Sequence, residues 1–199
     1  MRRSHILLAL CGATGLTACG GGGSDDGGFG KFTGAISMEE YAAFSMANDY
    51  EAMGFTPTDT VNAASNKASY SGIVNVGNGA GEQFYLGGLA LTADFAANTV
   101  EGSAGNFTRH DILGGFGPGE PPLYSTASVA GSFDIDATIT TANDVGIGSG
   151  IVGGASGTVE GVAVAYDVEG NFIGDGMEGI ALWFDGDTLG EGGVGVAAR

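Results

Sequence analysis

The residue types that carry out most protein chemistry are scarce in this sequence of 199 residues, which contains two histidines and two cysteines. His110 is the one histidine after residue 19, so a Ser-His-Asp triad would have to use it. No G-x-S-x-G motif, the usual setting of such a serine in one large hydrolase class, occurs in the sequence. The sequence therefore favours a surface-loop histidine, and we expect no enzymatic activity.

Two pairs of aspartates offer the carboxylate oxygens that calcium prefers. The pairs are Asp134 with Asp136, and Asp185 with Asp187. Neither pair fits the calcium loop that ends in a bidentate Glu, and there is no repeated Gly-Asp array. Solvated aspartates are the favoured interpretation, and we expect no metal site and no cofactor.

A candidate binding loop covers residues 109–124, which hold three of the four prolines together with charged and large apolar residues. Long loops of this kind are often functional. Its candidate ligand-binding residues are Arg109, His110, Leu113, Phe116 and Tyr124. These side chains could form an exposed contact patch, or they could fold back and plug one end of a barrel.

The N-terminus has the order of features found in a secretory signal. Arg2 and Arg3 precede a short apolar run at residues 6–13, which is too short to span a bilayer. Residues 16–19, Leu-Thr-Ala-Cys, resemble the lipobox of bacterial lipoproteins, in which the cysteine is acylated after cleavage. This resemblance implies that Cys19 is the lipidated first residue of the mature protein, anchored to a membrane. The Gly-rich residues that follow are typical of a flexible tether.

Composition limits the possible partners. All 23 acidic residues follow Cys19, and the formal net charge is −17. A field of this sign repels nucleic acid, so we expect no nucleic-acid partner. Because Cys11 would leave with the signal and Cys19 would carry lipid, we expect no disulfide in the mature domain. An apolar content of 43 per cent with only 15 per cent charged residues indicates a folded domain.

One helix is predicted near the N-terminus, over residues 38–52. Ser37 and Glu40 have the spacing of a capping box, in which each side chain accepts a hydrogen bond from the other residue's backbone N–H. Gly54 and Pro57 indicate that the helix has ended.

From residue 68 onward the pattern has the period of two that is typical of strands. In residues 126–140 the odd positions are mostly apolar and the even positions are mostly polar, with Asp134 and Asp136 on the wet side. Further strands are expected at residues 70–76, 84–95, 99–107, 145–152, 162–168, 180–184 and 193–199. About eight sequential strands with short turns predict an all-β, antiparallel up-and-down β-barrel with one short N-terminal helix. Aspartates on its outer face disfavour a membrane-spanning barrel.

Four segments resemble motifs of the transferrin-binding protein B β-barrel domain. They are residues 68–72, similar to its opening barrel strand; 94–102, similar to its D-F-x-x-x-T-φ-x-G hairpin (φ, apolar); 172–180, similar to F-Y-G-P-x-A-x-E-φ-G-G; and 193–199, similar to G-V-F-G-A-x-R. Ile173 and Asp175 depart from the third motif. The resemblance covers residues 68–199 and implies an outer-membrane lipoprotein with an eight-stranded barrel. Transferrin binding is not carried over, because the loops that carry it in the family have no counterpart that we can locate.

These observations predict four segments: a signal peptide at 1–18, the lipidated Cys19 and tether at 19–35, a helix region at 36–56, and a β-barrel domain at 57–199. The expected function is a lipid-anchored envelope or surface binding module for a protein or a small molecule. Capture of a nutrient or of a host protein enters only by analogy to the family. The alternative is a structural envelope lipoprotein without a dedicated ligand. An outer-membrane location is expected, and whether the domain faces the surface or the periplasm stays open.

Overall fold

The computed structural model describes residues 35–48, 50–77, 83–114, 123–140, 150–186, 189 and 192–199. The predicted signal peptide, Cys19 and the tether up to residue 34 lie outside these residues, as do Phe116 and Asp187. None of the described helices is long and apolar enough to cross a membrane.

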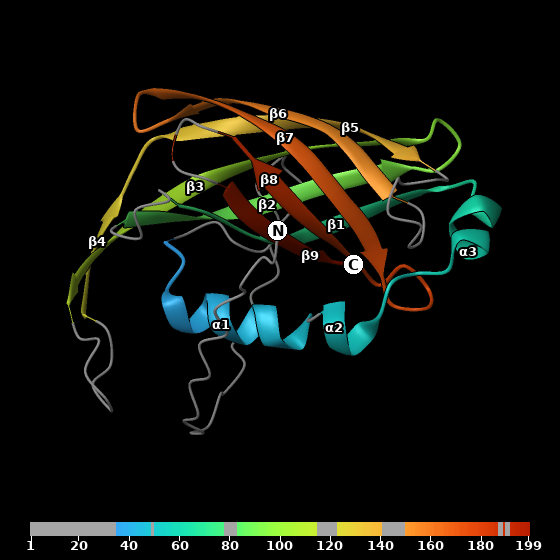
Figure 1. Ribbon diagram of the computed structural model, residues 1–199, viewed down its shortest axis with the longest axis horizontal. Coiled ribbons are helices and arrows are strands. Elements are labelled where there is room, and N and C mark those ends of the chain that lie inside the picture. Colours follow the sequence, from blue (N-terminus) through green and yellow to red (C-terminus); the bar gives the residue numbers. More distant parts are fainter. Residues whose placement is uncertain are drawn as a thin grey trace, which may run out of the picture.

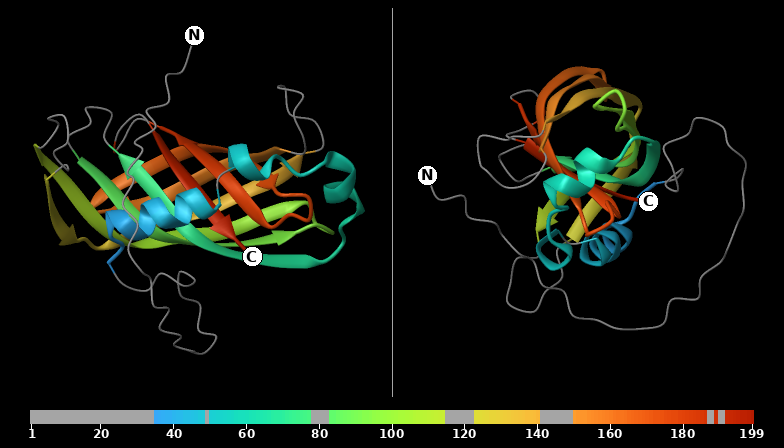
Figure 2. Two further views of the ribbon diagram at one scale, coloured as in Figure 1. Left: turned by 90° about the horizontal axis from the view of Figure 1, so that it is seen from below. Right: turned by 90° about the vertical axis from the view of Figure 1, so that its right-hand side faces the viewer.

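The fold is a closed antiparallel barrel of eight strands, which confirms the predicted all-β architecture. The barrel strands are β1 (Lys67–Gly77), β2 (Gln83–Asp94), β3 (Thr99–Gly114), β5 (Gly131–Thr140), β6 (Gly150–Val159), β7 (Val162–Ile173), β8 (Gly179–Asp185) and β9 (Gly192–Ala198). Each pairs with its neighbours in sequence, and β9 pairs with β1 to close the ring. Figure 2 shows the ring end-on. A ninth strand, β4 (Leu123–Ser128), pairs with β3 alone among the described strands.

The predicted strand at residues 126–140 is divided in two. β4 ends at Ser128, and β5 begins at Gly131, whose φ of 138° suits a glycine. A Cβ on Gly131 would lie 2.2 Å from the carbonyl oxygen of Thr158, so the chain can bend here only without a side chain. As a result β5 pairs with residues 99–105 of β3 and belongs to the ring. β4 pairs with residues 108–114 of β3 and lies outside the ring.

The alternation predicted for β5 is confirmed. Phe133, Ile135 and Ala137 are buried, whereas Asp134 and Asp136 are exposed. The inward side chains of all eight barrel strands join one hydrophobic cluster. In its middle the Phe133 ring lies 5.7 Å, centroid to centroid, from three other rings, those of Phe107, Tyr166 and Phe184. The interior is therefore occupied by packed side chains from opposite sides of the ring.

The helix predicted at 38–52 is present but interrupted. α1 (Met38–Ala47) has the expected capping box, because Glu40 N donates to Ser37 Oγ and Ser37 N donates to Glu40 Oε2. Asn48 ends α1 by donating from its side chain and its backbone to the carbonyl of Phe44, and α2 (Tyr50–Met53) follows. α1 lies on the outside of the ring (Figure 2).

A third helix, α3 (Thr58–Ala63), was not predicted and lies at the end of the barrel opposite β4 (Figure 1). Its Val61 joins the interior cluster. The chain before it is attached to β7 and the turn that follows: Thr56 N donates to Phe172 O at 2.9 Å, and Thr56 Oγ1 donates to Gly174 O at 2.5 Å. Residues 54–63 therefore help to close this end of the barrel.

Candidate binding surface at the β4 end

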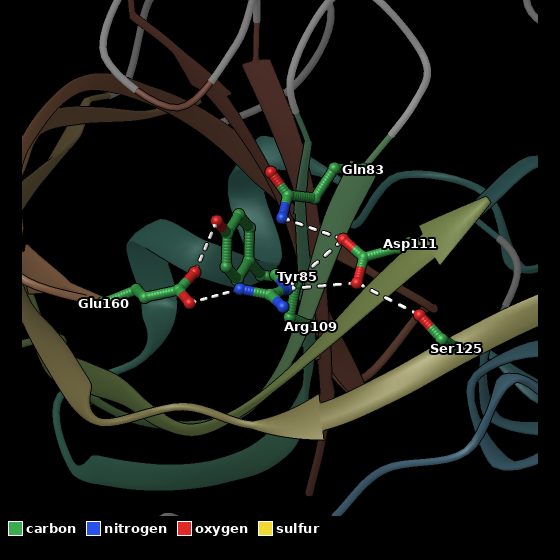
Figure 3. A network of polar contacts seen from close by, with 6 residues as sticks. All are labelled: Gln83, Tyr85, Arg109, Asp111, Ser125 and Glu160. Atoms are coloured by element: carbon green, nitrogen blue, oxygen red, sulfur yellow. Dashed lines mark hydrogen bonds and ion pairs between the residues drawn. The ribbon is translucent and has the colours of Figure 1, made fainter. Parts of the chain in front are cut away.

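The β4 end of the barrel carries a network of polar side chains, shown in Figure 3. One member comes from the β6–β7 turn, in which Glu160 and Gly161 both have positive φ, at 51° and 78°. This is the conformation of a two-residue type I′ hairpin turn. The turn projects the Glu160 carboxylate across the barrel end toward β2 and β3.

Glu160 joins the turn to both strands. Its carboxylate accepts a hydrogen bond from the Tyr85 hydroxyl at 3.0 Å and forms an ion pair with the Arg109 guanidinium. Burial and the hydrogen bond to Glu160 raise the pKa of Tyr85 to about 12, so this hydroxyl stays protonated at neutral pH. Tyr85 is therefore a hydrogen-bond donor here and not a base.

Asp111 extends the network to β4. It pairs with Arg109 at 3.2 Å and accepts hydrogen bonds from Gln83 at 3.0 Å and from Ser125 at 3.2 Å. The side chains of Arg109, Asp111 and Glu160 are between 28% and 35% exposed. Because water still reaches them, each ion pair contributes at most about 1 kcal/mol. Within the described part of the chain the network holds β2, β3, β4 and the β6–β7 turn together, and it contains no activated nucleophile.

His110 is not a surface-loop histidine, and that prediction was wrong. It lies in β3 and is only 2% exposed, on the outer side of the sheet. Its ring stacks on Phe84 with centroids 4.9 Å apart, meets Tyr124 edge-on, and has Nε2 3.2 Å from the carbonyl oxygen of Ile36. The segment that covers it comes from 74 residues earlier in the chain, so the local sequence gave no sign of this burial.

The candidate loop at residues 109–124 is shorter than expected, because β3 continues to Gly114 and β4 begins at Leu123. Of its candidate residues within the described part of the chain, only His110 and Tyr124 pack together. Arg109 belongs to the polar network, while His110 and Tyr124 pack on the outer face. Leu113 is 67% exposed, and Leu123 beside it is 61% exposed. Leu113 and Tyr124 therefore do not plug the barrel.

The residues that sequence reasoning missed are Gln83, Tyr85, Ser125 and Glu160. Glu160-Gly161 between two β-rich runs was the available signal for a tight turn with an acidic side chain. Nothing local indicated that Tyr85 and Arg109 would meet it, since 75 and 51 residues separate them from Glu160.

The outer edge of β4 has no strand partner among the described residues. Val129 N, one residue past β4, donates to Phe107 O at 2.9 Å. In an antiparallel pair the direction of the backbone groups alternates along the strand. Those of Tyr124, Thr126 and Ser128 therefore point away from β3, toward the free edge. β4 carries no charged residue, and we call β4 with its partner residues 108–114 of β3 the β3–β4 extension.

The motif at residues 172–180 forms the β7–β8 turn, at the end of the barrel opposite the extension. Glu178 accepts a hydrogen bond from Gly176 N at 2.9 Å, and its carbonyl oxygen accepts one from Arg199 N at 2.9 Å. The Tyr70 hydroxyl donates to Met177 O at 3.2 Å. These contacts give the turn a structural role in joining β1, β8 and the C-terminus.

Among the described residues, no group of three or more His, Cys, Asp or Glu side chains is placed to hold a metal ion. In comparisons with known proteins, no protein-family model matches the chain, and no curated protein matches it.

Proposed function

We propose that this protein is a lipid-anchored module of the bacterial cell envelope that binds a protein partner through the β3–β4 extension. The observation that carries the proposal is the outer edge of β4, which has no strand partner in the described part of the chain and extends beyond the closed ring (Figure 1). Leu113 and Leu123 at this extension are exposed. Natural proteins usually protect such an edge with charged residues or cover it. β4 has no charged side chain of its own.

A protein is a better candidate ligand than a small molecule in the barrel. The inward side chains of all eight barrel strands pack into one cluster, with Phe133 in contact with three other rings. A lipocalin-like site needs an interior that side chains leave open. The described surface features therefore favour binding outside the ring.

The chemistry of the extension defines the partner. Backbone groups at the edge of β4 can bind an extended segment that adds one strand to the sheet. The chain carries a formal charge of −17, so a basic segment is attracted and an acidic one is repelled. The exposed apolar side chains of Leu113 and Leu123 favour a partner segment that places an apolar residue against them.

The proposal of a lipid anchor is supported by the sequence. The basic start, the apolar run and Leu-Thr-Ala-Cys at residues 16–19 support acylation of Cys19. The resemblance of residues 68–199 to the transferrin-binding protein B barrel supports delivery to the outer membrane. A tether after Cys19 would let the barrel stand away from the lipid surface.

Binding at the edge of β4 is tested by photo-crosslinking on intact cells, with a photoreactive residue replacing the exposed Ala127. Thr126→Pro removes an N–H that points to the free edge, without removing a bond to β3. Thr126→Val keeps that N–H and is the matched control. We expect a defined protein adduct with T126V that is lost with T126P at an equal melting temperature.

Equal adducts in both variants would contradict strand addition at β4. The absence of any adduct in either variant would favour the alternative, a structural envelope lipoprotein without a dedicated ligand. Digestion of the tagged protein by added protease, with a periplasmic control spared, would place the binding surface outside the cell.

A further inference from the structure

The segment before and within α1 is held on the outer face of the barrel around one histidine. Ile36 is buried there with Ile73 of β1 and Leu86 of β2, and the cluster is completed by partly buried residues. Those residues are Met38, Tyr41, Phe44 and Phe84. His110 Nε2 and the Ile36 carbonyl oxygen, 3.2 Å apart, make a polar contact between this segment and the sheet.

That contact sets the protonation of the imidazole. A carbonyl oxygen only accepts hydrogen bonds, so Nε2 carries the proton and donates. Nδ1 is buried and has no hydrogen-bond partner among the described residues. A second proton would therefore go to Nδ1, where it would place a charge in a buried position without an acceptor.

The groups around the imidazole do not offset the free-energy cost of burying this charge. β2 contributes the stacked Phe84 ring, and β4 contributes the edge of Tyr124. α1 has Glu39 and Glu40 on its exposed side, where Glu40 is bound to Ser37. Burial lowers the pKa of His110, and the opposing effects of the Ile36 carbonyl and of Asp111 are smaller.

We propose that His110 is an acid-sensitive latch, which holds residues 36–47 on the barrel when neutral and releases them when protonated. The proposal goes beyond the function proposed above and does not depend on a partner. In the released state the imidazole is in water with its ordinary pKa, which is 6.5. The released state therefore takes up the proton first, so the docked state is favoured above about pH 6.5 and weakens as the pH falls below it.

The size of the effect is limited by one proton. A single titrating group changes the docking equilibrium by at most about tenfold per pH unit. Between pH 7.5 and 5.5 the expected change is therefore about tenfold. Release would uncover Ile73, Leu86 and Phe84.

Hydrogen exchange of the full chain, followed by mass spectrometry, tests the latch. A helix as short as α1 has only marginal stability away from the barrel, so release exposes its backbone amides to hydrogen exchange. After correction for intrinsic rates, protection of residues 36–47 should fall about tenfold from pH 7.5 to 5.5, whereas that of β7 should not change.

His110→Gln keeps an N–H that can reach Ile36 but does not titrate, and it should remove the pH dependence. Glu40→Gln is the matched control on the same segment; it weakens the cap at both pH values and should leave the pH dependence in place. Equal protection of residues 36–47 at both pH values, or the same loss in His110→Gln, would overturn the proposal. If His110→Gln does not fold, the pH dependence of protection in the wild-type chain alone tests the proposal. A loss that begins only below about pH 5 would assign release to carboxylates and contradict the latch.

Discussion

Tyr85 donates a hydrogen bond of 3.0 Å to Glu160, which connects β2 to the β6–β7 turn across the β4 end of the barrel. The same carboxylate pairs with Arg109, so one acidic side chain in a tight turn holds β2 together with the β3 strand of the extension. Support of this kind would matter for the proposed binding, because an edge strand that frays presents no ordered backbone groups to a partner.

We predict a small but measurable coupling between these two residues. Tyr85→Phe and Glu160→Gln should each reduce the free energy of unfolding by about 1 kcal/mol. Combined, they should cost less than the sum of the two single changes, by roughly 0.5 kcal/mol or more. Urea unfolding of the four proteins in this cycle measures the coupling. Strictly additive losses would show that the bond contributes nothing.

The interior should behave as a filled core. Phe133→Ala removes a ring that contacts three others, and we expect a loss of about 3–5 kcal/mol in the free energy of unfolding. Chemical denaturation measures it. A loss below about 1 kcal/mol would mean that the barrel tolerates an empty interior, and it would reopen the case for a small ligand inside the ring.

Closure of the barrel depends on a glycine in β1. A Cβ on Gly72 would lie 1.8 Å from the carbonyl oxygen of Val196 in β9, so β1 and β9 would have to separate. We expect Gly72→Ala to cost about 3 kcal/mol or more. Gly154→Ala in β6 is the matched control, since its Cβ meets nothing closer than 3.5 Å. Similar melting temperatures for the two variants would contradict the observed strand spacing.

Three buried tyrosines predict a loss of stability in alkali. Burial raises the pKa of Tyr70, Tyr85 and Tyr166 to about 12, from an ordinary value of 10. The unfolded chain therefore loses these protons first, and stability that is complete below about pH 10 declines as the pH approaches 12. Absorbance titration of the phenolates should show a late group of tyrosines. Complete ionisation near pH 10 while the fold persists would contradict their burial.

The exposed leucines should matter for binding and not for folding. Leu113→Ser and Leu123→Ser remove apolar side chains that are mostly in water, so the free energy of unfolding should change by less than about 0.5 kcal/mol each. A photoreactive residue at the exposed Ala127 of β4 can then report on the proposed partner in both variants. We expect weaker adducts than in the wild type. Unchanged adducts would remove these leucines from the binding surface.

Much of the fold could be predicted from local pattern. The alternation in β5 and the Ser37–Glu40 capping box are properties of neighbouring residues, and both are confirmed. The bend at Gly131 was missed because it follows from the Thr158 carbonyl on the next strand. α3 was missed because its Val61 is held by the barrel interior rather than by a helical pattern of its own.

The candidate surface was harder to predict, since its residues meet only through the closed ring. His110 was assigned to a loop because the Ile36 segment that buries it is distant in sequence. Leu113 was identified, and it is exposed as a contact residue would be. Tyr85 and Glu160 were missed, because an inward tyrosine and a turn glutamate look unrelated until the strands that carry them are placed side by side.

The proposed envelope function depends on acylation of Cys19, and metabolic labelling of cells with an alkyne-bearing palmitate tests this acylation most directly. The wild-type chain should incorporate the label and partition into detergent, whereas Cys19→Ser, which retains Cys11, should be unlabelled. An unlabelled wild-type chain, or label that persists in Cys19→Ser, would contradict a lipid-anchored binding module.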